Sequence, residues 1–365
     1  MTEIVLILAL LYLCLMIVFA VFASRAQYPS VAEYRPTVSI VIAARDEEAN
    51  IAECLDSIVR LVYPRELLQV IIIDDASTDR TAELAAQYVN VHDWISIIHA
   101  KKTPHLKGKA NALAQGIDAT TGEIIMMTDA DCIVPEGWVE NTVKYYLHDN
   151  IGIVAGFTSL RARSMFECAQ ALDWFALVSV AAATARMGSP VTAVGNNLSF
   201  RRKAYDSVGG YSRLPPSLTE DFILVRSIVT QTYYRCIFPM DPDGLVESKP
   251  CQSLRELFLQ KKRWFIGGLD MGWKQIAIFT AAFLLNGLII VTLLGEHGWM
   301  GWVVMSGKCV ADLLVLFPSL RTFSRWQMLR GFIAYELYSF LYVLIFPLVL
   351  TVSRSVVWKH RILNK

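Results

Sequence analysis

Four long apolar runs constrain this chain more than any other feature of its sequence. They cover residues 4–22, 276–294, 299–320 and 332–352, each close to the roughly 20 residues that an α-helix needs to cross a bilayer. Apolar residues make up 54% of the 365 and charged residues only 18%, so the chain is richer in hydrocarbon than an ordinary soluble domain. We therefore expect an integral membrane protein.

The first run predicts an uncleaved anchor over residues 1–24. A cleaved signal peptide is the alternative, but it would have a basic start and a shorter apolar core. This chain begins Met-Thr-Glu, and Arg25 follows the run. Positive charge gathers on the cytosolic side of membrane segments, so we expect the anchor to end in the cytosol.

The three C-terminal runs, within residues 275–352, leave the topology of the last one open. The connector 321–330 carries three arginines and no acid, which favours the cytosol, whereas the connector 295–298 carries only Glu296 and His297, which suits the far side. Three full crossings would place the basic tail 353–365 outside, against the same rule. The last run therefore either re-enters the membrane or breaks the rule.

Two charged residues, Lys308 and Asp312, lie four positions apart inside the third run. Intramembrane charges are usually functional or paired. We expect these two to form an ion pair on a helix that faces another helix.

Residues 36–250 alternate between segments typical of strands and segments typical of helices. Short β-branched or apolar runs predict strands, and apolar residues at a 3.6-residue spacing predict helices. The predicted strands are 37–43, 70–73, 95–99 and the run that begins at 124, and the predicted helices include 51–61, 81–89 and one after 107–111. The alternation indicates an α/β fold with a largely parallel sheet covered on both faces.

A further long apolar segment, 164–188, is interrupted by Glu167, Asp173 and Arg186. We interpret it as an amphipathic helix near the membrane or the path of an acceptor and not as a membrane span, with an ordinary packed helix as the alternative.

Two carboxylates, Asp129 and Asp131, follow the buried run at 124–127. If the chain stays extended there, alternate side chains point the same way, so both acids would meet at the carboxyl end of a strand. Open α/β sheets bind ligands at that edge, and paired carboxylates suit Mg²⁺ or Mn²⁺ shared with a diphosphate. The alternative is an acidic turn with no ligand.

Composition excludes some classes of function. The net charge of +1 gives no electrostatic case for nucleic acid as a partner. The seven cysteines show no paired or metal-binding spacing, so we expect reduced, mostly buried thiols in a domain that faces the cytosol.

Taken in order, several motifs resemble the family 2 glycosyltransferases, which have the GT-A fold. They are VSIVIAARDEEANIAECLDSI, IIIDDASTD, KGKANAL, MTDADC, NNLSFRR, TED and QKKRW, between residues 36 and 270. The chain looks like the membrane-integrated subset, which includes cellulose, hyaluronan, chitin and poly-N-acetylglucosamine synthases and ceramide glucosyltransferases. One departure is visible: the first turn reads Ala43-Ala44-Arg45-Asp46-Glu47, where many relatives carry Asn before the Glu.

The resemblance implies a domain plan. A GT-A domain would cover residues 36–250, interfacial helices with the QxxRW motif 251–274, and membrane helices 275–352. It also implies a donor site in which Asp74 and Asp75 contact uracil or ribose, Glu47 assists, and Lys109 reaches nucleotide or phosphate. The alternatives are an Asp-rich turn and a solvated lysine.

The resemblance also implies catalytic roles. Asp129 and Asp131 would hold Mg²⁺ or Mn²⁺ on the donor diphosphate, with Asp131 the preferred ligand and Asp129 also near the nucleotide. Asp221, with Glu220 beside it, would be the general base that takes a proton from an acceptor hydroxyl. A single displacement then inverts an α-linked donor to a β-linked product. The alternative is that these acids only cap a helix.

The remaining motif residues would contact donor or acceptor. Gln260, Arg263 and Trp264 resemble the acceptor-end motif, since an indole stacks on sugars and Arg pairs with pyrophosphate. The alternative is an interfacial helix with Lys-Lys-Arg near anionic lipid. Asn196, Asn197 and Arg201 are expected to line the sugar or acceptor region.

These inferences predict a membrane-bound inverting glycosyltransferase that moves a sugar from a UDP-sugar to a lipid or lipid-linked acceptor. A processive polysaccharide synthase is the alternative within the same class, and a non-catalytic nucleotide-sugar-binding membrane protein is the alternative outside it. We expect a cytosolic catalytic domain at a bacterial inner membrane. The sequence does not identify the sugar or any protein partner.

Overall fold

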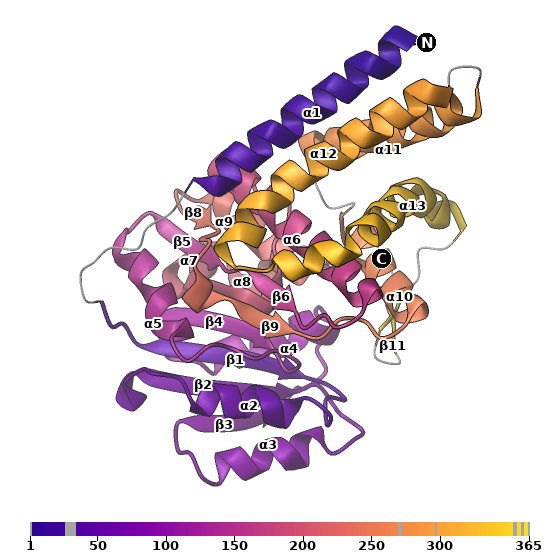
Figure 1. The fold of residues 1–365 in the computed structure, drawn as a ribbon. Coiled ribbons are helices and arrows are strands. Elements are labelled where there is room, and N and C mark those ends of the chain that lie inside the picture. The colour runs from indigo at the N-terminus through magenta and orange to yellow at the C-terminus, as the bar shows by residue number, and fades with distance from the viewer. Residues whose placement is uncertain are drawn as a thin grey trace. The chain divides into compact units, whose positions relative to one another are not determined.

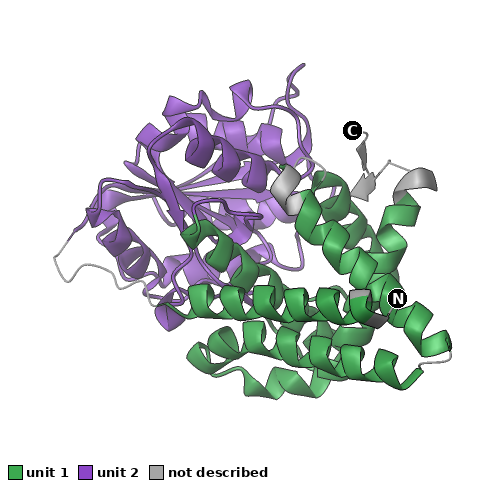
Figure 2. Cartoon of the chain, turned by 90° about the horizontal axis from the view of Figure 1, so that it is seen from above, with its two compact units in different colours: residues 1–25, 160–187, 250–365 green, residues 26–159, 188–249 purple. Residues whose placement is uncertain are grey.

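The computed structural model describes residues 2–25, 34–268, 272–295, 298–352, 356–358 and 361–363. They form two compact units (Figure 2). Unit 1 comprises residues 1–25, 160–187 and 250–365, and unit 2 comprises residues 26–159 and 188–249. Segment 160–187 thus belongs with the apolar helices of unit 1, although the sequence placed it inside the 36–250 domain.

Unit 2 is built around a seven-stranded sheet with strand order β3-β2-β1-β4-β7-β5-β8 (Figure 1). β3, β2, β1 and β4 are parallel, β7 is antiparallel to both β4 and β5, and β8 is parallel to β5. The strands are β1 (Val38–Ala44), β2 (Leu68–Asp74), β3 (Ile95–His99), β4 (Ile124–Asp129), β5 (Ile151–Ala155), β7 (Leu198–Arg201) and β8 (Arg235–Ile237). This largely parallel sheet is the predicted GT-A architecture.

The other elements of unit 2 lie between and after these strands. The helices are α2 (Ile51–Val59), α3 (Thr81–Val89), α4 (Gly108–Asp118), α5 (Trp138–Val143), α7 (Arg202–Ser207), α8 (Gly210–Arg213) and α9 (Glu220–Gln231). Short 3₁₀ helices are η1 (Arg65–Leu67), η2 (Lys144–Leu147), η3 (Gly195–Asn197) and η4 (Pro242–Gly244), and β6 (Thr158–Leu160), whose last residue falls in unit 1, pairs with β9 (Val246–Ser248).

Side-chain alternation explains why helices cover both faces of the sheet. Ile40 and Ile42 of β1 point into a core shared with α2, α3 and α5. Val41 points to the other face, where α4 packs so closely that a Cβ on Gly116 would lie 3.0 Å from it. Continuous apolar strands such as VSIVIAA form because both faces are buried.

Unit 1 contains the apolar helices together with a more polar helix over residues 254–268. They are α1 (Thr2–Ser24), α6 (Met165–Arg186), α10 (Leu254–Gly268), α11 (Trp273–Leu294), α12 (Gly298–Thr322) and α13 (Phe332–Val352), with η5 (Trp326–Gly331) and a hairpin of β10 (Val356–Trp358) and β11 (Arg361–Leu363). Among the residues that the structure describes, five helical segments are long and apolar enough to cross a membrane: 5–24, 165–186, 276–294, 298–322 and 326–349. The predicted anchor and C-terminal membrane helices are therefore present as helices.

Helix α6 differs from the other four candidates because most of it is buried within the structure. Inside its most apolar window 78% of the residues are buried, against 17% for the first candidate. Polar Gln170 and Ser179 are buried along with its apolar residues, so α6 is not amphipathic. The ordinary packed helix, the alternative considered for this segment, describes it correctly.

The expected ion pair between Lys308 and Asp312 is present, and residues of two other helices join it. Lys308 Nζ lies 2.7 Å from Asp312 Oδ2 and 2.8 Å from Glu336 Oε2 of α13, and Tyr12 of α1 donates to Asp312. These buried bonds connect three helices, as expected for charges that face other helices rather than lipid.

Some predictions lie outside the described residues. They concern the connector residues Glu296 and His297 and most of the basic tail 353–365.

Candidate active site

Three parallel strands of unit 2 end at one edge of the sheet, and acidic turns follow them. In the register of the sheet, Ala43 of β1 pairs with Asp129 of β4, and Ala44 pairs with Asp74 of β2. Because parallel strands share a direction, the turn residues Glu47, Asp75 and Asp131 leave from this same edge. The acidic residues proposed from the sequence therefore leave the sheet at a common edge.

Lys109 connects the acidic end of β4 to the start of α9. Its Nζ lies 2.5 Å from Asp129 Oδ1 and 4.0 Å from Glu220 Oε1. Burial lowers the pKa of Lys109, but the carboxylates of Asp129 and Glu220 outweigh burial and hold that pKa above its ordinary value. Lys109 is thus a fixed positive charge among the predicted site acids rather than a solvated lysine.

Asp131 lies in a turn and not in the strand. β4 ends at Asp129, and the N–H of Cys132 donates to the Asp129 carbonyl at 3.1 Å, which closes the turn. Burial, together with the charges of Asp129 and Glu47, raises the pKa of Asp131 to about 6. The turn, rather than strand alternation, therefore brings the two aspartates together.

This crowding of acids fits a divalent cation, because hard cations prefer oxygen ligands and would relieve the repulsion. Within the described residues, however, no group of three or more His, Cys, Asp or Glu side chains is arranged to hold a metal by itself. Asp129 already contacts Lys109. The residues fit a cation held by Asp131 and Asp129 and completed by oxygens of a bound diphosphate.

Asp221 lies in the first turn of α9, and its carboxylate is held by two backbone donors. Gly195 N–H donates to Oδ2 at 2.7 Å, and Phe222 N–H donates to Oδ1 at 2.8 Å. Burial and the adjacent Glu220 charge raise the pKa of Asp221 to about 6, while Lys109 opposes the shift. A carboxylate with this pKa is ionised at neutral pH and is a stronger base than an ordinary Asp.

Gly195 was not predicted from the sequence, and its lack of a side chain matters here. A Cβ at this position would lie 3.2 Å from Asp221 Oδ2 and 3.3 Å from Asp221 Cβ. We expect Gly195→Ala to displace the carboxylate by a few tenths of an ångström and to lower kcat about tenfold, because small misplacements of a catalytic group are costly in rate. Steady-state kinetics test this.

Gly244→Ala is the matched control for that substitution. Its new Cβ would meet nothing closer than Asp241 Cβ at 3.8 Å. Equal kcat values for Gly195→Ala and Gly244→Ala would contradict a positioning role of Gly195.

Asp74 and Asp75 lie at the end of β2 and in the turn after it, and both are buried. Asp74 Oδ1 accepts from Ser77 N–H at 3.1 Å, and Oδ2 lies 3.1 Å from Nδ1 of His99, whose side chain is 70% exposed. Arg45 donates to the carbonyl of Asp75 at 2.5 Å. The pair therefore shapes its turn, and His99 joins it at the end of β3.

The structure corrects the role expected for Arg201. This residue pairs with Ile124 at the start of β4, about five residues, or roughly 17 Å, from Asp129. Its guanidinium donates to the carbonyls of Ile151 and Tyr146. Arg201 therefore supports the sheet and does not line the site around Asp129.

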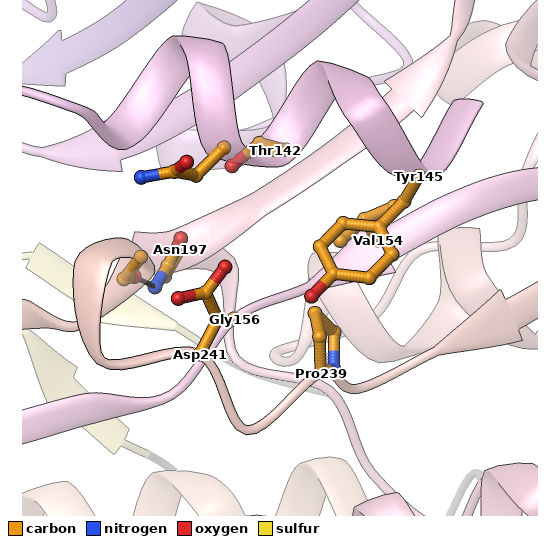
Figure 3. Close-up of a pocket in the computed structure, with 9 residues that line it drawn as sticks. Thr142, Tyr145, Val154, Gly156, Asn197, Pro239 and Asp241 are labelled. Carbon is orange, nitrogen blue, oxygen red and sulfur yellow. Dashed lines mark hydrogen bonds between the residues drawn. The ribbon is translucent and has the colours of Figure 1, made fainter. Parts of the chain in front are cut away.

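Asn197 and Asn196 form hydrogen bonds to other residues of the protein. Trp138 Nε1 donates to Asn197 Oδ1 at 2.9 Å, and Asn197 Nδ2 donates to the carbonyls of Phe157 and Gly244 at 2.8 and 3.0 Å. Asn197 lies on the wall of a small pocket with Asp241 and Tyr145 (Figure 3). Both N–H groups of the Asn197 amide are therefore used by backbone carbonyls, and Asn196 accepts from Thr158 at 2.9 Å.

The QxxRW residues Gln260, Arg263 and Trp264 all lie on α10 of unit 1. The Trp264 ring packs edge-to-face on Trp174 at 5.1 Å, and Lys261 Nζ lies 4.2 Å from its centroid while pairing with Asp173. Lys261 and Lys262 are buried, so they do not face lipid headgroups as the interfacial-helix alternative required.

Comparison with known proteins agrees with this fold. Residues 39–209 match the family model described as glycosyl transferase family 2. A β-monoglucosyldiacylglycerol synthase of Nostoc sp. is 30% identical over 64% of this chain and 49% of its own length. A poly-β-1,6-N-acetyl-D-glucosamine synthase of Staphylococcus aureus is 25% identical over 64% of this chain and 55% of its own. The chain spans about half the length of such curated relatives.

A solved structure with the same fold covers almost the whole chain. It is a mannosyltransferase from Pyrobaculum calidifontis in complex with GDP-Man and Mn²⁺, with a TM-score of 0.59 and 20% identity over 93% of this chain and 98% of that one. At this identity the likeness shows the fold alone. With the family model, the ordered motifs and the apolar helices, it leads to one conclusion: residues 39–209 form a glycosyltransferase family 2 domain with a GT-A fold, in a chain that also carries hydrophobic helices.

Proposed function

We propose that this protein is a membrane-bound inverting glycosyltransferase that moves a sugar from a UDP-sugar to a lipid or lipid-linked acceptor. The observation that carries the proposal is the group formed by Asp129, Lys109, Glu220 and Asp221, in which Lys109 contacts acids from two distant parts of the chain. A helix cap alone would not require Asp221 to be held by Gly195 near a lysine whose side chain is only 19% exposed.

In the proposed reaction Asp221 takes the proton from an acceptor hydroxyl as that oxygen attacks the anomeric carbon. The bond from that carbon to the diphosphate oxygen breaks, and the nucleoside diphosphate leaves with the electron pair. Backbone N–H groups of Gly195 and Phe222 hold Asp221 in one orientation throughout. One displacement at the anomeric carbon gives inversion, so an α-linked donor yields a β-linked product.

Asp131 and Asp129 would hold Mg²⁺ or Mn²⁺ on the donor diphosphate. When bound, the cation supplies Lewis-acid stabilisation of the departing diphosphate. Lys109 keeps a positive charge beside Asp129, which prevents a buried excess of negative charge around the phosphates. Asp74, Asp75 and Glu47 are proposed to contact the nucleoside.

We propose a lipid acceptor because few candidate spans are available to build a channel for a growing polymer, whereas a lipid needs only lateral access. The Nostoc relative, a glucosyldiacylglycerol synthase, supports this choice. Gln260, Arg263 and Trp264 are proposed to contact the acceptor. We place the protein in a bacterial inner membrane with unit 2 in the cytosol.

The test is the partition of product made from radiolabelled UDP-sugars by membranes that carry the protein. Label in the organic phase is the expected result. Label in an aqueous product of high mass would instead establish the second candidate, a polysaccharide synthase, which the QxxRW motif and the Staphylococcus relative favour.

The acid limb of the pH profile should report Asp221. Its pKa of about 6 lies above the ordinary value, and the base acts only when ionised, so kcat should fall tenfold per pH unit below about 6. The Glu220 charge contributes to that raised pKa, so Glu220→Gln should lower it and move the acid limb to lower pH. An unchanged or higher midpoint in Glu220→Gln would contradict this electrostatic account. The profile is measured at saturating donor and metal.

A further inference from the structure

We infer that unit 1 carries a docking surface for anionic phospholipid headgroups, formed by an arginine cluster at one level of the helices. The arginine cluster comprises Arg161, Arg163, Arg321, Arg325 and Arg330. It comes from two segments that are distant in sequence, the residues before α6 and the stretch that runs from the last turn of α12 to the start of α13. The inference is independent of the donor, acceptor and catalytic roles proposed above.

Direct contacts hold these two segments side by side. Arg330 donates to the carbonyl of Arg163 at 2.6 Å, and its Nε lies 3.1 Å from Cys168 Sγ. Gly331 approaches α6 so closely that a Cβ there would lie 2.6 Å from Cys168 Cβ. Packing contacts therefore hold the two arginine-bearing segments next to each other.

Little negative charge opposes the cluster. In residues 160–170 and 317–331 the single acid is Glu167. Its Oε2 accepts the backbone N–H groups of Arg163 and Ser164 at 2.6 and 2.8 Å, as part of the cap of α6. Arg163, Arg321 and Arg330 are exposed. The three exposed arginines and a single capping carboxylate leave an excess of positive charge on these two segments.

The cluster lies where two membrane candidates end. The span 298–322 ends beside Arg321, and the span 326–349 begins at Trp326, which is 43% exposed and packs against Phe317 at 5.4 Å. Trp is enriched at the level of lipid headgroups. Both observations put the arginines at headgroup depth, where phosphate groups are the available anions.

The charge of the whole unit favours the same partner. Unit 1 contains 17 Lys and Arg against 8 Asp and Glu, a net charge of +9, whereas unit 2 contains 17 against 25, a net charge of −8. The near-neutral total of +1 hides this division. A membrane unit with this excess suits a leaflet that contains anionic lipid.

The test uses the full-length protein reconstituted in vesicles of equimolar phosphatidylcholine and phosphatidylglycerol. Electron paramagnetic resonance of spin-labelled lipids measures the association of phosphatidylglycerol relative to phosphatidylcholine. We expect the wild type to prefer phosphatidylglycerol and Arg163→Gln/Arg321→Gln to lower that preference, by roughly fivefold for each arginine if both bind at once. This pair leaves the packing contacts of Arg330 in place.

Two further variants keep the result interpretable. Arg163→Lys/Arg321→Lys retains the charge and should retain the preference, which separates charge from folding. Arg60→Gln/Arg235→Gln removes the same charge from exposed positions of unit 2 and should leave the preference unchanged. No preference in the wild type, or equal loss in this control pair, would overturn the inference. Loss of the preference in the presence of inorganic phosphate would also overturn it, because it would indicate a site for free phosphate.

Discussion

Asp221→Asn should reduce kcat by about 10³-fold while leaving nucleotide affinity unchanged, because a positioned general base contributes on that scale and the amide cannot accept the acceptor proton. Its Oδ1 can still accept one of the two N–H groups, from Gly195 or Phe222, that hold the native carboxylate. Single-turnover kinetics and UDP titration on the same preparation measure both quantities.

Folding should not account for that loss. The pKa of Asp221 is raised in the folded protein, so the folded state disfavours the ionised group and that group opposes stability above pH 6. A neutral Asn removes this unfavourable contribution at neutral pH, which offsets the lost hydrogen bond. We expect a melting temperature close to that of the wild type. Retained turnover in Asp221→Asn would refute the base assignment.

Asp131→Asn should lower kcat/KM by about 100-fold and weaken the dependence of UDP affinity on Mg²⁺ or Mn²⁺. Of the two acids Asp129 and Asp131, Lys109 forms its ion pair with Asp129. A bound cation would relieve the electrostatic repulsion between Asp131 and the carboxylates of Asp129 and Glu47. Titrating UDP with and without added metal separates metal binding from catalysis.

Asp93→Asn is the matched control, since Asp93 is an exposed acid elsewhere in unit 2. It should leave metal-linked affinity unchanged. If Asp131→Asn bound UDP with the wild-type metal dependence, the metal site would have to be assigned to other residues.

The sequence predicted the sheet edge well because its signals are local. Apolar strands followed by acidic turns identify β1, β2 and β4, and parallel strands necessarily bring those turns together. The same reasoning erred at Asp131, where the chain turns after Asp129 instead of remaining extended. The two acids are neighbours in either case, so the error did not change the predicted site.

The sequence failed where burial decides the role of a polar residue. Arg201 and Asn197 resemble ligand-binding residues by type, but each satisfies buried backbone or ring partners that only the fold brings near. The sequence analysis also missed Gly195. Nothing in the sequence indicates that the N–H of this glycine donates to a carboxylate 26 positions away. Lys261 carries a charge that suggests solvent, yet it is buried between Asp173 and Trp264.

The most direct test of the central claim is nucleoside diphosphate release from a panel of UDP-sugars by membranes carrying the wild type or Asp221→Asn. The account predicts release that requires Mg²⁺ or Mn²⁺ in the wild type and is lost in Asp221→Asn. Equal release by both proteins would contradict the catalytic role of Asp221. Tight UDP binding without release from any donor, in membranes that contain lipid acceptors, would instead identify a nucleotide-sugar-binding protein.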